Sequence, residues 1–121
     1  MDMAYEPLTD TKLAELQSRI DGWKAKFGDQ GGIRSIEVPD EEGDDFSGIF
    51  RVPTKDDLER SSRKELSNME SDTQLCMLCV LYPEPEVLQG IFRKSWGLCV
   101  PISKKLLQLS KVTREARAKK L

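Results

Sequence analysis

The stretch GIRSIEVPDEEGDDFSGIFRVPT, residues 32–54, carries a strand pattern between segments that have helical spacing. The alternating positions are Arg34, Ile36 and Val38 before the acidic loop, and Phe46, Gly48, Phe50 and Val52 after it. A period of two residues is typical of a strand with one buried face. The stretch therefore predicts a two-stranded antiparallel hairpin over residues 33–52. Because a lone hairpin is only marginally stable, its apolar side chains must pack on helices.

The preceding segment, residues 10–28, predicts a leading helix. Its apolar residues recur at steps of three and four, which places them on one helix face. They are Leu13, Leu16, Ile20, Trp23 and Phe27. Thr9 or Asp10 can cap the start, and Gly28 can end the helix in the left-handed conformation. The paired glycines at 31 and 32 indicate a turn into the first strand.

The segment after the hairpin, residues 54–112, predicts a helical region. Thr54 and Asp57 have the spacing of a capping box, which indicates a helix that runs to about Ser67. We expect a polar break at residues 68–72 and then further helices with helical apolar spacing. These are an apolar helix capped by Asp72 or Thr73 and running through Leu81, a helix over residues 84–95, and a last helix from about Pro101.

The expected fold is α+β, with four to five helices packed with a two-stranded antiparallel β-hairpin. A chain of 121 residues has room for one domain, flanked by an N-terminal tail at residues 1–9 and a basic C-terminal tail at residues 113–121. With 38% apolar and 33% charged residues, the composition is that of a globular protein.

Charge is divided unevenly along the chain, although the net charge is only −2. Residues 1–59 contain fifteen acidic and seven basic side chains, whereas residues 60–121 contain six acidic and twelve basic ones. Such a chain can attract its own copies head to tail, or an oppositely charged partner at either end. The competing interpretation is that both charged regions are solvated surface.

The residue inventory argues against most catalytic sites. The chain has no histidine, which removes Ser-His and Cys-His pairs and any imidazole base. Neither glycine motif of nucleotide-binding sites is present. The carboxylates at residues 40–45 lack the spacing of a calcium-binding loop. We expect a protein without catalytic residues, cofactor, metal or small-molecule substrate, with a hydrolase based on paired carboxylates as the remaining enzymatic alternative.

Cys76 and Cys79 are separated by two residues, a spacing found in redox pairs and zinc sites. They lie inside the apolar run LCMLCVL at residues 75–81, and Cys99 is the one other cysteine. A structural zinc site needs four ligands, and a reactive thiol pair sits at an exposed helix N-terminus. We therefore interpret both as buried core thiols, with metal binding and redox activity as the alternatives.

No segment approaches the roughly 18 apolar residues that predict a membrane-spanning helix. The acidic N-terminus is unlike a signal peptide, so we expect a cytoplasmic protein. The C-terminal segment KVTREARAKKL, residues 111–121, is basic and could contact phosphates. It has no aromatic residue for base stacking, so a frayed or partner-docking helix end is favoured over nucleic-acid binding.

The order of elements resembles the small tail assembly chaperones of long-tailed bacteriophages and their prophage relatives. The motif FRVPT, residues 50–54, matches the strand that leads through a basic residue and a proline into a helix. Residues 83–87 and 97–109 occupy the places of the family's later proline-containing segment and closing helix. The resemblance extends over about residues 10–112.

This resemblance implies a non-enzymatic protein that keeps the tape measure protein soluble and helps to recruit tail tube subunits. It would act in the cytoplasm of the bacterial host. The alternative is a small structural component of the phage particle, such as a connector, ring or cargo protein, which would be found in the virion. In that role, the uneven charge could support a homo-oligomeric ring.

The region expected to contact a partner lies in residues 75–109, which hold more apolar side chains than one short helical hairpin normally buries. We expect Phe92 and Trp96 to be the aromatic anchors, flanked by basic residues that would meet carboxylates. The basic residues are Arg93, Lys94, Lys104 and Lys105. The competing interpretation is that both aromatic side chains belong to the core.

Overall fold

The computed structural model describes residues 5–40, 45–62, 66–110 and 118–120. The predictions for the acidic loop and the basic C-terminal segment fall largely on residues 41–44 and 111–117, which lie outside the described residues.

The predicted α+β class is confirmed, but the sheet has three strands rather than two. Its order is β1 (Ile33–Val38), β2 (Phe46–Arg51) and β3 (Val80–Tyr82), and both pairings are antiparallel. The predicted hairpin is the β1–β2 pair. The expected helix through Leu81 ends earlier, and its last apolar residues form β3. A short run of apolar residues suits a buried strand as well as a buried helix, so periodicity does not separate the two.

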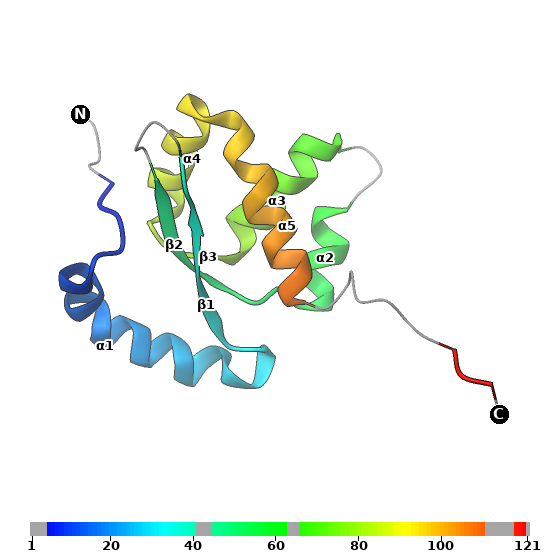
Figure 1. The fold of residues 1–121 in the computed structure, drawn as a ribbon, viewed down its shortest axis with the longest axis horizontal. Helices are drawn as coiled ribbons and strands as arrows, with labels where there is room; N and C mark the ends of the chain where they lie inside the picture. The colour runs from blue at the N-terminus through cyan, green and yellow to red at the C-terminus, as the bar shows by residue number, and fades with distance from the viewer. Residues whose placement is uncertain (1–4, 41–44, 63–65, 111–117, 121) are drawn as a thin grey trace.

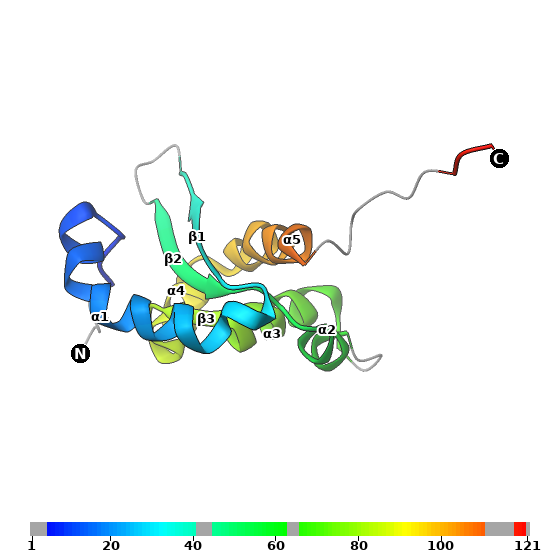
Figure 2. The same cartoon turned by 90° about the horizontal axis from the view of Figure 1, so that it is seen from below.

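Helices and two short 3₁₀ turns complete the described fold (Figure 1). They are α1 (Asp10–Phe27), η1 (Gly28–Gln30), α2 (Lys55–Ser61), α3 (Asn68–Cys79), α4 (Pro85–Lys94), η2 (Trp96–Leu98) and α5 (Cys99–Leu109). Figures 1 and 2 show α1 on one side of the strands, while α4 and α5 lie on the other side.

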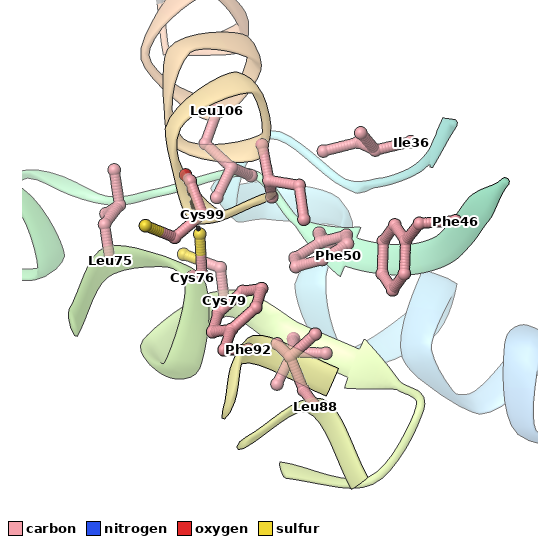
Figure 3. Close-up of a cluster of buried hydrophobic side chains, with 12 residues drawn as sticks. Ile36, Phe46, Phe50, Leu75, Cys76, Cys79, Leu88, Phe92, Cys99 and Leu106 are labelled. Atoms are coloured by element: carbon pink, nitrogen blue, oxygen red, sulfur yellow. Dashed lines mark hydrogen bonds between the residues drawn. The ribbon is translucent and has the colours of Figure 1, made fainter. Parts of the chain in front are cut away.

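The central strand, β2, is buried on both faces. Phe46 and Phe50 point into the main core, where side chains from α3, α4 and α5 surround them (Figure 3). Ile49 points to the opposite face and packs with Leu16 and Ile20 of α1. Gly48 is required here by close approach, because a Cβ atom would lie 2.7 Å from the backbone oxygen of Tyr82.

Several predicted helix boundaries need correction. The polar residues 68–72 form the first turn of α3, because Ser67 caps the helix by accepting a hydrogen bond from the Glu70 amide. An exposed polar first turn is compatible with a helix, so the break does not lie at residues 68–72 as expected. The helix expected to run to about Ser67 ends at Ser61, and Ser67 instead caps the next helix. Gly28 has right-handed backbone angles, and the positive φ angles occur at Gly31, with a φ of 102°, and at Gly32, with a φ of 81°.

The predicted capping box at Thr54 is confirmed, and it belongs to a larger buried network. The Thr54 hydroxyl accepts from the Asp57 amide, while the Asp57 carboxylate accepts from the Thr54 amide at 2.8 Å. Arg51 donates to both carboxylate oxygens of Asp57 and to the carbonyl of Leu78. One ion pair therefore connects β2, α2 and the end of α3.

The part of the N-terminal tail that is described packs on the sheet. The Tyr5 ring stacks on Phe46 with centroids 5.7 Å apart, and its hydroxyl bonds to the backbone of Ser47. The Leu8 amide donates to the Ser47 side chain at 2.8 Å. These contacts hold the tail beside β2 at a point that the short strand β3 does not reach.

Candidate protein-binding face

The exposed large apolar side chains of the described residues are Met69, Trp96 and Val100. Val100 lies in the first turn of α5, and Trp96 lies in η2 directly before it. Met69 is close to the same turn, because the Cys99 thiol contacts its sulfur at 3.3 Å. The exposed apolar surface is thus gathered around the N-terminal end of α5, as expected for an interaction site rather than for scattered surface residues.

Trp96 is exposed because α4 ends before it. Phe92 and Trp96 are four residues apart and would share a face if the helix continued. The helix ends at Lys94, and the chain turns through η2 into α5. Phe92 stays in the core at 7% exposure, whereas Trp96 is 69% exposed.

A wide hollow of about 860 Å³ lies beside Trp96. Its apolar lining includes Tyr5, Phe46, Ile91 and Leu98, which come from four separate segments of the chain. Lys94 also lines this hollow.

A second, smaller hollow of about 290 Å³ lies between β1 and α5. Residues 35–39 line one side, and the other side is lined by Pro101, Lys104, Lys105 and Gln108. Val38, Pro39 and Pro101 line both hollows, so the two hollows are adjacent. We call the two hollows together the β1–α5 groove.

The two walls of the groove carry opposite charges. Lys104 and Lys105 lie on the α5 wall, with Lys94 at the Trp96 end, and all three are exposed. None of these lysines forms an ion pair with another residue in the described ranges. The β1 wall carries Glu37, and Asp45 lines the larger hollow. The lysines are therefore available to a partner that presents carboxylates.

The predicted site residues separate into three groups. Trp96, Lys94, Lys104 and Lys105 line the groove. Arg93 is exposed but lines neither hollow. Phe92 belongs to the core cluster (Figure 3), so the core interpretation holds for this residue and it cannot serve as an exposed anchor.

Sequence reasoning missed the β1 side of the groove. Val38, Pro39 and Tyr5 are far from α5 in the sequence and approach it only through the tertiary fold. The available signal was the alternation of β1, which places Ile36 and Val38 on one face. That signal indicates burial but does not reveal which helix lies opposite.

The cysteines lie in the core, as predicted. Cys76, Cys79 and Cys99 are free thiols at 0% exposure (Figure 3). Burial raises the pKa of Cys79 to about 12 and raises the pKa of Cys76 as well. A reactive thiol needs the opposite shift. Within the described residues, no group of three His, Cys, Asp or Glu residues is placed to hold a metal ion.

None of the described helices combines the length and apolar character needed to cross a membrane.

Comparison with known proteins gives a fold likeness and no family. No protein-family model and no curated protein matches the chain. A similar solved structure is that of an uncharacterised protein from Bacillus stearothermophilus, with a TM-score of 0.58 and 22% sequence identity. The match covers 84% of this chain and 97% of that chain. At this level of identity, the likeness concerns the fold alone.

Proposed function

We propose that this chain is a non-enzymatic phage tail assembly chaperone. It binds the tape measure protein, tail tube subunits or both during virion assembly, in the cytoplasm of the bacterial host. The proposal rests on the resemblance of residues 10–112 to that family and on one structural observation. This observation is the exposed Trp96 at one end of a groove whose lysines have no ion-pair partner among the described residues.

The chemistry of the groove suits a protein client. A large exposed aromatic side chain next to an apolar hollow can act as a central anchor, and anchors of this kind contribute most of the affinity in protein interfaces. Flanking lysines favour a client with carboxylates beside its apolar residues, and they increase the rate of encounter. The same surface could cover an apolar segment of a long client until assembly uses it.

The alternative is a small structural component retained in the particle. The uneven division of charge between residues 1–59 and residues 60–121 favours this alternative, because opposite faces of adjacent copies could attract each other in a ring. Mass spectrometry of purified particles separates the two functions. A chaperone is expected to be absent from mature particles, whereas a structural component is present in stoichiometric amounts.

Co-expression with tail proteins from the same phage genome tests the chaperone function. We expect the chain to co-purify with the tape measure protein or the tail tube subunit and to increase the soluble fraction of that client. Failure to capture either protein, together with unchanged client solubility, would contradict the proposed function.

A further inference from the structure

Strand β1 is a regular strand at the edge of the sheet. It pairs with β2 through all six of its residues without a register shift, and no strand of the described fold pairs with its other side. The opposite edge strand, β3, has three residues and an irregular register. Short length, bulges and proline normally protect strand edges from pairing. Within its six residues, β1 has none of these features.

The pairing register shows which backbone groups of β1 face outward. The Val52 amide donates to the carbonyl of Gly32 at 3.1 Å. These two residues are opposite each other, one position beyond the pair of Ile33 and Arg51, so they form a hydrogen-bonded pair. Hydrogen-bonded and non-hydrogen-bonded pairs alternate in an antiparallel ladder. Arg34 and Ile36 therefore bond to β2, and the amide and carbonyl groups of Ser35 and Glu37 face away from it.

Contacts on the other side of β2 agree with this alternation. Ser47 is opposite Glu37, so its backbone groups must also point out of the β1–β2 pair. They do, because both the amide and the carbonyl of Ser47 bond to the Tyr5 hydroxyl. Ser47 thus has a partner for its outward groups. On the β1 edge, Ser35 and Glu37 line the smaller hollow of the groove.

The space beside this edge lies next to α5. Pro101, Lys104, Lys105 and Gln108 of α5 form the wall opposite residues 35–39. In Figures 1 and 2, α5 is next to β1 and β2 lies on the other side of β1. A strand added to β1 would therefore direct alternate side chains toward Lys104 and Lys105.

Charge decides between the possible occupants. A second copy paired antiparallel through β1 would bring its own α5 to the same face, so that lysines would face lysines across the junction. Carboxylates on the added strand would instead pair with Lys104 and Lys105, which have no ion-pair partner in the described ranges. The α5 wall of the groove thus fits a partner segment with acidic residues on the side that faces α5.

We propose that β1 binds an extended segment of a partner protein as a fourth antiparallel or parallel strand. Carboxylates at alternate positions of this segment face Lys104 and Lys105, and an apolar residue reaches the hollow beside Trp96. Backbone hydrogen bonds provide affinity and the alternate side chains provide selectivity, as in other cases of strand addition. The inference rests on the proposed protein-binding function and adds the conformation and charge of the bound segment.

Amide hydrogen exchange of the full chain, followed by NMR, tests this inference with a short synthetic peptide that alternates Val and Glu. In the protein alone, we expect slow exchange at Arg34 and Ile36 and fast exchange at Ser35 and Glu37. The peptide should slow amide exchange at Ser35 and Glu37 by about five- to tenfold. This factor corresponds to the net stabilisation by one hydrogen bond. A peptide that alternates Val and Lys is the matched control and should leave both amides unchanged.

Two variants of Ser35 add an independent test. Ser35→Pro removes an outward amide without removing a bond to β2, and an edge strand tolerates proline at such a position. Ser35→Ala keeps the amide and is the control. We expect the Val/Glu peptide to bind the Ala variant and to lose binding to the Pro variant. If the Pro variant does not fold, the exchange measurement on the unmodified chain still decides the question.

Four results would overturn the inference. The first is that the Val/Glu peptide does not bind, and the second is that both peptides protect the Ser35 and Glu37 amides equally. The third is that protection of these amides rises with protein concentration in the absence of peptide. The fourth is that the peptide changes the NMR signals of Trp96 but leaves amide exchange at Ser35 and Glu37 unchanged. The third would identify a second copy as the occupant. The last would leave the proposed binding face intact. Protection by the peptide without capture of tail proteins would instead overturn the proposed function and leave the inference standing.

Discussion

Arg51 of β2 donates to the Leu78 carbonyl of α3 and to the buried carboxylate of Asp57 in α2. Burial alone would raise the pKa of Asp57, but hydrogen bonds from Arg51 and Thr54 outweigh burial and lower the pKa from 3.8 to about 2. The ionised carboxylate is thus the form that the fold stabilises. The capping box was predictable because Thr54 and Asp57 are three residues apart. Arg51 and the Leu78 carbonyl were not, because β2 and α3 meet only in the tertiary structure.

Thr54→Ala should lower the free energy of unfolding by about 1 kcal/mol, because it removes the acceptor that caps α2. Thr54→Ser keeps a hydroxyl at this position and should restore most of the loss. Chemical denaturation of the three proteins measures both effects, and client capture at low temperature should remain intact. Equal stability of the Ala variant and the unmodified chain would show that the cap does not contribute.

Acid should destabilise the fold through Asp57. Its folded-state pKa is below its unfolded value, so its stabilisation is complete above about pH 4 and is lost as pH falls toward 2. The difference corresponds to about 2 kcal/mol. Asp57→Asn should remove this part of the pH dependence, whereas Asp56→Asn on the exposed side of α2 should retain it. Denaturation curves between pH 2 and 6 test the expectation, and identical pH profiles for Asp57→Asn and the unmodified chain would contradict it.

The junction between α4 and α5 separates a core residue from a surface residue. Phe92 packs with β2 and α3, while Trp96 follows the end of α4 and is exposed. Sequence periodicity predicted both helices, but it did not determine which of the two aromatic residues is buried, because that depends on the tertiary packing at the end of α4. Sequence periodicity also failed to predict β3. The apolar run continues past the end of α3, and such a run suits either a helix or a strand.

Alanine substitutions should distinguish these two aromatic residues. Phe92→Ala leaves a cavity in the core and should cost about 3–5 kcal/mol of stability. Trp96→Ala removes a side chain that is 69% exposed and should change stability by less than about 0.5 kcal/mol. Urea denaturation measures both. A loss in Trp96→Ala as large as that in Phe92→Ala would mean that Trp96 supports the fold and is not a free anchor.

In the whole molecule, the β1–α5 groove forms where the β1–β2 hairpin meets helices that follow it in the sequence. The fold class and the presence of the hairpin could be predicted, because alternation and helical spacing are local patterns. The groove could be predicted only in part. The residues of its helical side are close together in the sequence, whereas those of its β1 side come from the N-terminal half of the chain. The first set is Lys94, Trp96, Lys104 and Lys105, and the second is Tyr5, Val38 and Pro39. No local pattern specifies that residues 35–39 lie opposite α5.

In the proposed function, the β1–α5 groove binds a tail protein. The most direct measurement is the Kd for the tail protein that co-purifies with the chain, compared among the unmodified chain, Lys104→Glu and Lys24→Glu. Both substitutions replace an exposed lysine with the same residue, but Lys104 lies in the groove and Lys24 lies on α1. We expect Lys104→Glu to weaken binding by about tenfold, or about 1.4 kcal/mol, and Lys24→Glu to leave the Kd unchanged. Equal affinities for all three proteins, or a larger loss in Lys24→Glu, would contradict this expectation.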